Sequence, residues 1–322
     1  MESKRPHWIL NRHLEVLGGP DGLVAVGVGS PAQVRDIRKE IHWYANTAFI
    51  PVPLADFDDE DAAANVIGQA ITALGKRERH KVLIVLCDEM LEHKTYLKPL
   101  KLTGYPVVYS STHQHSIFGH IKHRWFHHLV PHVMCGDQQG DVLEFGSYMG
   151  SSMTSLYYTL APHCPWMRFF AFDSFSGLKG VLAKESRKLD FIYEGGYFSN
   201  IATFTHYMRF AGIPDGEVRP VQCDFLTDFR KPEKFYAGLG LETCLIAHID
   251  CDVYTPALAA LEFIEPLTVQ GTILVFDDYF LFNGSDKAGE KRALKEWLEC
   301  HPDLQVEPLQ SHSSAKSFLV NR

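Results

Sequence analysis

Short apolar runs alternate with segments of helical periodicity along the first third of the chain. Strands are predicted where the apolar runs are continuous, at residues 23–29, 49–54, 81–87 and 106–110. Helices are predicted at residues 32–44 and 62–74, where apolar residues recur at helical spacing. Strands that alternate with helices form parallel sheets, because each helix carries the chain back to the same edge. We therefore expect residues 1–115 to form a small α/β accessory domain.

The same alternation resumes at residue 141 and continues to the C-terminus. Apolar runs predict strands at 141–145, 168–172, 218–222, 247–249 and 271–276. Helical periodicity lies between or after them, at 151–160, 204–211, 257–270 and 291–299. Two short strands at 304–307 and 317–320 are expected as an antiparallel pair at the sheet edge. The pattern thus predicts a second α/β domain over residues 137–322.

A histidine-rich segment at residues 116–136 links the two predicted domains. Periodicity over residues 117–130 predicts a helix on which His120, His123 and His127 fall near one face. Histidines in this arrangement can bind a metal, or one of them can reach an active site as ligand or base. A partly solvated helix beside the next sheet explains the same pattern, so both interpretations stay open.

Composition and charge narrow the classes of function. The chain of 322 residues is 46% hydrophobic and 22% charged, typical of a globular protein. Its formal net charge is −8: residues 1–115 hold 13 Lys/Arg and 14 Asp/Glu, and the remainder holds 18 and 25. An acidic second half without a run of basic residues argues against nucleic acid as a partner.

Cysteine use and hydropathy predict a cytoplasmic protein. The seven cysteines are an odd number without CxxC spacing, which fits neither a disulfide framework nor a zinc site. No apolar run reaches the ~20 residues of a membrane span, and the N-terminal segment lacks the apolar core of a signal peptide. We expect free thiols in a reducing compartment and no membrane partner.

Four aspartates follow two of the predicted strands: Asp250, Asp252, Asp277 and Asp278. The strand–helix–strand segment between them is a parallel βαβ unit, which brings both strand ends to one edge of the sheet. Carboxylates that converge there repel one another, so a divalent cation such as Mg²⁺ is the simplest explanation. Helix capping explains Asp252 equally well. It does not explain two adjacent acids at a strand end.

A glycine-containing turn, GSYMGSS, follows the strand at 141–145 and precedes a helix. Gly146 permits the sharp turn, and Gly150 lets a ligand approach the backbone, as at nucleotide-binding edges. Asp173 ends the next strand, where ribose hydroxyls are held in this architecture. Asp224 ends the third strand and would lie beside the base of a nucleoside. A second turn, GVGSP at 27–31, lacks the full G-x-G-x-x-G fingerprint.

Residues 179–203 carry mixed charge, several aromatic residues and the pair Gly195-Gly196. This composition is too irregular for a core element. It predicts a mobile lid over the neighbouring site.

Four motifs make the second domain similar to class I S-adenosylmethionine-dependent methyltransferases. They are VLEFGSYMGSS at 142–152, FDSFSGL at 172–178, HIDCDVYTPALAAL at 248–261 and QGTILVFDDY at 270–279. More narrowly, the last two and their spacing resemble the macrocin O-methyltransferase family, whose members modify sugars of natural products. The resemblance covers residues 135–322 and implies a Rossmann-like sheet with an antiparallel C-terminal edge. Residues 223–229 depart from the family pattern, which leaves the acceptor open.

The resemblance also implies which residues bind metal and cofactor. The metal ligands would be Asp250, Asp277 and Asp278, and the catalytic residues would be Asp252, as general base, and Asp250. Contacts to S-adenosylmethionine would come from the strand ends and the turns that follow them: Glu144, Gly146, Ser147, Tyr148, Ser151, Asp173, Ser174 and Asp224.

These inferences predict a metal-dependent O-methyltransferase that acts on a hydroxyl of a small molecule, such as a sugar or a glycosylated natural product. A homo-oligomer is expected by analogy with the family. Two alternatives stay open: a catechol-type or N-methyltransferase on the same fold, and a non-catalytic scaffold that binds the cofactor. The missing G-x-G-x-x-G fingerprint disfavours a nucleotide-binding oxidoreductase.

Overall fold

A computed structural model describes most of the chain. The described residues are 12–13, 15–17, 22–41, 48–78, 81–87, 91, 94–109, 125–187, 189 and 191–322. They form two compact units: Met1–Ser116 with Phe198–Pro214, and Ile117–Tyr197 with Asp215–Arg322. Sequence periodicity did not predict that residues 198–214 group with the first unit.

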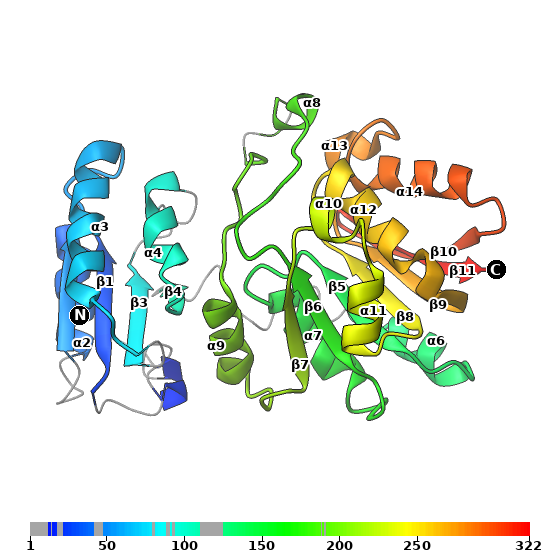
Figure 1. The fold of residues 1–322 in the computed structure, drawn as a ribbon, viewed down its shortest axis with the longest axis horizontal. Helices are drawn as coiled ribbons and strands as arrows, with labels where there is room; N and C mark the ends of the chain where they lie inside the picture. The colour runs from blue at the N-terminus through cyan, green and yellow to red at the C-terminus, as the bar shows by residue number, and fades with distance from the viewer. Residues whose placement is uncertain are drawn as a thin grey trace, which may run out of the picture. The chain divides into compact units, whose positions relative to one another are not determined.

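The first unit is built on a four-stranded parallel sheet (Figure 1). Its strands are β1 (Val24–Gly29), β2 (Ala48–Pro53), β3 (Val82–Leu86) and β4 (Val107–Tyr109), in the order β2-β1-β3-β4. Its helices are α2 (Pro31–Ile41), α3 (Glu60–Leu74), α4 (Lys98–Leu102) and α9 (Ile201–Ala211), with a 3₁₀ turn, η3 (Thr95–Leu97), before α4. The four strands and two helices predicted from periodicity match β1 to β4, α2 and α3 within a few residues at each boundary.

Helix α9 belongs to the first unit because its N-terminus is bonded to the end of that unit's sheet. Asn200 caps the helix and donates from Nδ2 to the carbonyls of Lys101 at 2.7 Å and Tyr105 at 3.1 Å. Thr203 accepts the Val107 N–H at 2.9 Å. These buried polar contacts are specific, since each unpaired backbone group would cost free energy.

The second unit is built on a seven-stranded mixed sheet. Its strands are β5 (Asp141–Phe145), β6 (Phe169–Asp173), β7 (Val218–Gln222), β8 (Cys244–Ile249), β9 (Thr268–Phe276), β10 (Gln305–His312) and β11 (Ala315–Asn321). The order is β10-β11-β9-β8-β5-β6-β7, in which β5 to β9 are parallel and the last two strands are antiparallel. The predicted fold class, including the antiparallel C-terminal edge, is confirmed.

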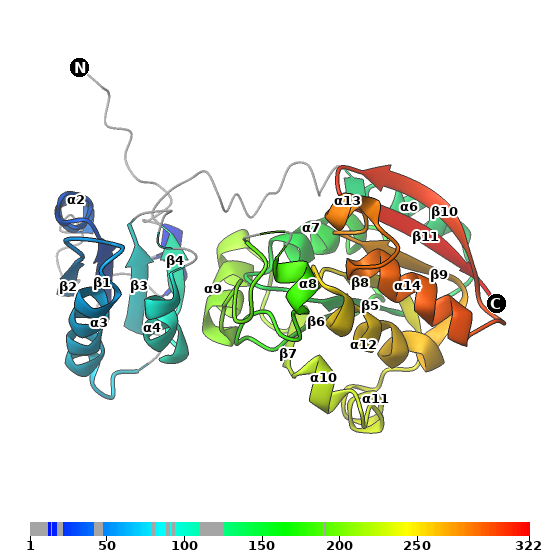
Figure 2. The same ribbon diagram turned by 90° about the horizontal axis from the view of Figure 1, so that it is seen from above.

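Helices cover both faces of this sheet, as Figure 2 shows. The helices of this unit are α6 (Leu129–Cys135), α7 (Ser151–Leu160), α8 (Ala183–Ser186), α10 (Phe225–Asp228), α11 (Glu233–Leu239), α12 (Tyr254–Ile264), α13 (Leu281–Gly284) and α14 (Gly289–Cys300), with a 3₁₀ turn, η4 (Glu265–Leu267). On one face, α12 and α14 pack against alternate residues of the central strands, among them Phe145, Ile249 and Phe276, all fully buried. The intervening residues of the same strands therefore face the opposite side, because side chains alternate along a strand.

The predicted helix at 117–130 lies largely outside the described residues, as do His120 and His123. His127 is described, and the helix begins at Leu129. None of the helices in the described part of the chain is both long and apolar enough to cross a membrane.

Candidate active site

The turn after β5 contains a glycine, Gly146, that no other residue can replace without displacing the neighbouring backbone. Gly146 has φ of +93°, and a Cβ built on it would lie 1.8 Å from the Asp250 carbonyl oxygen. In the sheet, β6 lies on one side of β5 and β8 lies on the other. Gly146, at the end of β5, therefore lies at the point where the strand order reverses. Open α/β sheets bind their ligands at such points.

Asp173, at the end of β6, holds the same turn from the other side. Its carboxylate accepts the backbone N–H groups of Tyr148 at 2.8 Å and Phe175 at 2.7 Å. Burial raises the pKa of Asp173, and the N–H groups that it accepts oppose this rise. Tyr148 and Phe175 both adopt φ of +47°, a strained conformation for bulky residues.

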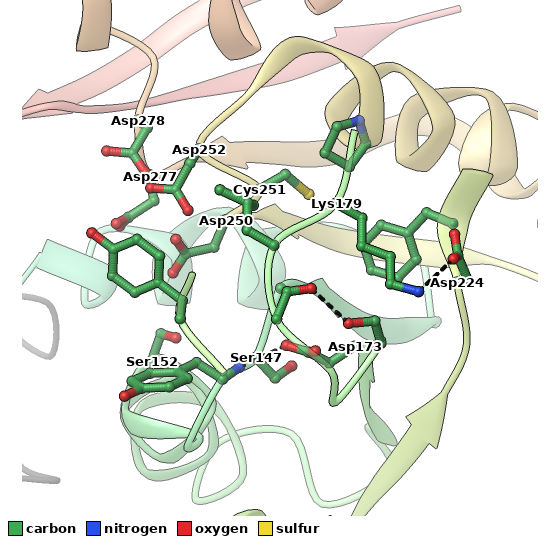
Figure 3. A pocket seen from close by; sticks show the side chains of 18 of the residues that line it. Ser147, Ser152, Asp173, Lys179, Asp224, Asp250, Cys251, Asp252, Asp277 and Asp278 are labelled. Atoms are coloured by element: carbon green, nitrogen blue, oxygen red, sulfur yellow. Dashed lines mark hydrogen bonds and ion pairs between the residues drawn. The ribbon is translucent and has the colours of Figure 1, made fainter. Parts of the chain in front are cut away.

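These elements border a cavity of about 410 Å³ within the second unit. It is lined by Gly146, Ser147, Tyr148, Ser151, Ser152, Asp173, Ser174, Gly177, Leu178, Lys179, Phe191, Tyr197, Cys223, Asp224, Phe225, Leu226, Asp250, Cys251, Asp252, Pro256, Asp277, Asp278, Leu281 and Ser314. Asp250, Asp252, Asp277 and Asp278 gather at one end, and Asp173 and Asp224 lie toward the other (Figure 3). Every residue predicted for the site lines this cavity except Glu144.

Glu144 is fully buried on β5 and bonds to a histidine instead of facing the cavity. Its Oε1 atom lies 3.0 Å from Nδ1 of His248, the residue directly opposite on β8. The two side chains share the sheet face opposite α12 and α14, because the β5 and β8 residues next to them pack toward those helices. Glu144 was predicted as a cofactor contact, but its carboxylate bonds to His248 and the residue does not line the cavity.

His248 has a buried nitrogen close to Asp277, one of the aspartates that line the cavity. Its buried Nε2 atom has no hydrogen-bond partner and lies 3.9 Å from Asp277 Oδ1. Ligand atoms of His248, Asp250 and Asp277 all lie within 4.8 Å of one another. Burial lowers the pKa of His248, but the carboxylates of Asp277 and Glu144 outweigh it and raise the pKa to about 10.

This group fits a divalent cation on its own chemistry. A buried imidazole nitrogen without a partner and two carboxylates are suitable ligands, and Glu144 supplies the carboxylate that holds the histidine ring in orientation. A cation would replace the imidazole proton, since only the neutral ring can bind a metal. The group shares Asp250 and Asp277 with the predicted ligand set, but includes His248 and not Asp278.

Asp278 and Glu290 form a second layer of acids at this end. Glu290, on α14, is fully buried and accepts the backbone N–H groups of Cys251 at 3.0 Å and Asp278 at 2.9 Å. Burial raises the pKa of Glu290 well above its usual range, and Asp250 raises it further. Burial does the same to the pKa of Asp278, which the neighbouring Asp252 and Glu290 raise further.

Sequence reasoning missed both His248 and Glu290. His248 had a readable signal, because Glu144 and His248 are polar residues inside apolar strands. Glu290 had none, since it lies in the polar stretch GEKRALKEW that opens an amphipathic helix.

Asp252 sits at the centre of a tight turn. The Val253 N–H donates to the Cys251 carbonyl at 2.6 Å, and Asp252 between them has φ of +58°. Such three-residue turns are rare and strained. Strain of this kind persists only where the surroundings hold it, and it is concentrated at functional sites.

Asp224 is engaged at the opposite end of the cavity. It caps α10 by accepting the Leu226 N–H at 3.0 Å, and it pairs with Lys179 at 2.8 Å. Lys179 belongs to the segment that the sequence predicted as a lid. A nucleoside placed beside Asp224 would therefore lie next to this ion pair.

Comparison with known proteins agrees with this geometry. Residues 143–279 match a family described as a methyltransferase domain. A search of curated protein sequences found no match. Among solved structures, the O-methyltransferase NovP is similar with a TM-score of 0.51 and 16% identity over 72% of this chain and 93% of NovP. The calicheamicin methyltransferase CalS11 has a TM-score of 0.51 and 19% identity over 83% of this chain and 94% of its own.

The second unit therefore shares the fold of these methyltransferases, and residues 143–279 within it match a methyltransferase domain. The family match spans the glycine turn after β5, Asp173 and the acidic ends of β8 and β9. The strand order, with its antiparallel edge, agrees with the structural neighbours. The class of enzyme predicted from the four motifs, an S-adenosylmethionine-dependent methyltransferase, is confirmed.

Proposed function

We propose that this protein is a metal-dependent O-methyltransferase that methylates a hydroxyl of a sugar or a glycosylated natural product. One observation carries the proposal: a cofactor-type glycine turn and two carboxylates of the His248–Asp250–Asp277 group line the same cavity. The names of NovP and CalS11 support O-methyl transfer and a natural-product acceptor, respectively. The motif resemblance to macrocin O-methyltransferases supports a sugar.

Cofactor binding rests on the turn between β5 and α7 and on Asp173. Gly146, Ser147 and Ser151 line the cavity, and the missing side chain of Gly146 lets the Asp250 backbone pack against the turn. Asp173 uses two lone pairs on the turn and keeps others for ribose hydroxyls. Bound S-adenosylmethionine supplies an electrophilic methyl group on sulfur.

Asp250, Asp277 and His248 hold the divalent cation, and Asp252 receives the proton of the acceptor hydroxyl. When bound, the cation supplies positive charge that favours loss of that proton. The remaining contribution of the protein is positioning, because methyl transfer requires the acceptor oxygen in line with the methyl group.

A methyl-transfer assay with labelled S-adenosylmethionine tests the proposal. The acceptor panel holds glycosides with vicinal hydroxyls, a catechol and a primary amine, each with Mg²⁺, with Mn²⁺ or with EDTA. We expect label only in a glycoside and its loss with EDTA. Transfer to the catechol or the amine would assign a different acceptor class. Transfer that persists in EDTA would rule out a catalytic cation. Cofactor binding without transfer to any acceptor would favour the scaffold alternative.

A further inference from the structure

Glu185 is a fully buried carboxylate in the irregular segment that the sequence predicted as a lid. It lies on the single-turn helix α8, and its Oε2 atom accepts the Leu182 N–H at 3.2 Å. Its Oε1 atom accepts two further N–H groups from distant parts of the fold, Tyr254 at 3.1 Å and Gly289 at 2.9 Å. One side chain thus joins this segment to the beginnings of α12 and α14.

The same segment forms part of the cavity wall. Leu178, Lys179, Phe191 and Tyr197 line the cavity. Behind them, the fully buried Ile192 packs with Val253, Phe282 and Ala288. The segment therefore borders the cavity on one side and packs against the core around Val253 on the other.

The proposed base lies between two such buried carboxylates. Glu290 accepts the N–H of Cys251, one residue before Asp252, and Glu185 accepts the N–H of Tyr254, two residues after it. Asp252 itself has the strained φ of +58°. The two carboxylates hold both ends of the strained turn, and only Glu185 comes from the cavity-lining segment.

We propose that Glu185 is a positioning residue that couples the segment 178–197 to the turn carrying Asp252. Binding of the cofactor orders the segment. Because the Glu185 carboxylate accepts the N–H groups of Tyr254 and Gly289, the ordered segment also restricts the motion of the backbone at these two residues. The inference rests on the proposed function, because it requires a cofactor in the cavity and takes Asp252 as the base.

The coupling can be measured at two amides, those of Tyr254 and Gly289, which a ligand in the cavity does not contact. Neither Tyr254 nor Gly289 lines the cavity, so a ligand there can slow their amide exchange only through the protein. Hydrogen exchange of the full chain is measured with and without S-adenosylhomocysteine as probe. We expect about tenfold slower exchange at both amides when the probe binds, within the range of coupling between sites. Unchanged exchange at these amides, with protection at residues 146–152, overturns the inference.

Three variants separate coupling from simple packing. Glu185→Ala removes both oxygens that accept the three N–H groups, and we expect the probe to lose its effect at Tyr254 and Gly289 while residues 146–152 stay protected. Glu185→Gln keeps one oxygen able to serve these two amides, so the effect should return. Glu194→Ala is the matched control, because Glu194 accepts the N–H groups of Gly180 and Val181 within the segment and does not reach the turn.

The possible failures are distinguishable. A full probe effect in Glu185→Ala overturns the coupling and leaves the proposed function standing. A probe that protects no residue in 146–152 of the wild-type chain overturns the cofactor site and the coupling with it. Should Glu185→Ala fail to fold, the wild-type experiment still decides, because it needs no substitution.

Discussion

Both sheets of this chain have a glycine-containing turn after a central strand, yet the two turns differ in what surrounds them. After β1, Gly29 packs against Cys87, where a Cβ would lie 2.7 Å from the Cys87 Cβ, and Ser30 and Gln33 cap each other across the start of α2. After β5, Gly146 contacts the Asp250 backbone and borders the cavity. The described lining of that cavity comes entirely from the second unit.

The difference between the two turns shows that the topology of a parallel sheet does not by itself create a binding site. Parallel strands supply an edge where helices begin, and side chains decide whether that edge becomes a binding site. In the second unit the edge has Asp173 on one side and the Asp250–His248–Asp277 group on the other. In the first unit the capping Ser30 and Gln33 bond to each other across the same position.

The largest expected effect separates the two glycines. Gly146→Ala forces a Cβ into the Asp250 carbonyl at a positive φ, so affinity for S-adenosylhomocysteine should fall about 100-fold or more. Gly29→Ala crowds Cys87 in the other unit and should leave that affinity unchanged. Calorimetry on both variants checks the contrast, and equal losses would show that the first unit contributes to the cofactor site.

The next effect separates the two ends of the cavity. Asp173→Ala removes a charged hydrogen-bond acceptor for the ribose and should weaken S-adenosylhomocysteine binding about 10–100-fold. Asp277→Ala should leave that binding within about twofold, because Asp277 lies at the acidic end. If Asp277→Ala weakens binding and Asp173→Ala does not, Asp277 contacts the cofactor and Asp173 does not.

A smaller effect is expected from the residue that the sequence placed in the cofactor site. Glu144→Gln cannot hold the His248 ring with a charge, so affinity for Mn²⁺ should fall about 10–100-fold. Affinity for S-adenosylhomocysteine should not change. Asp278→Asn is the matched comparison: if it weakens Mn²⁺ binding and Glu144→Gln does not, the predicted all-aspartate ligand set is correct and His248 is not a ligand.

The smallest effect is the change in the stability of each unit as the pH falls. We expect this change to have opposite signs in the two units. In the first unit His13 Nδ1 lies 2.7 Å from His206 Nε2, and burial lowers the pKa of His206 to about 3. The unfolded chain binds a proton there below its ordinary pKa of ~6.5, so stability falls by up to ~1.4 kcal/mol per pH unit between pH ~6.5 and ~3.

The acid cluster of the second unit behaves in the opposite way without metal. The pKa values of Asp278 and Glu290 are raised on folding, so the folded state binds protons more tightly and gains stability as the pH falls toward their unfolded values near ~4. Urea unfolding at pH 7.5 and 5.5, read by pulsed hydrogen exchange in each unit, checks both signs. His206→Gln should flatten the response of the first unit alone, and a parallel response of both units would contradict the account.

Much of this structure was predictable because local patterns decided it. Apolar runs such as KVLIVLC and TILVF predicted strands, and the aspartates after the strands at 247–249 and 271–276 predicted one rim. The grouping of α9 with the first unit was not predictable, since it depends on Asn200 and Thr203 meeting the end of another segment's strand. The pairing of Glu144 with His248 was also hidden, because it depends on the register of two strands 104 residues apart.

The proposed function requires Asp250 and Asp277 to hold a divalent cation beside the cofactor. Calorimetric titration of Mn²⁺ into the complex with S-adenosylhomocysteine tests it most directly, in the wild-type chain and in Asp277→Asn. We expect one bound ion per wild-type chain and loss of that binding in the variant, with the cofactor still bound. Absence of Mn²⁺ binding in the wild-type chain, or equal binding in both proteins, would contradict it.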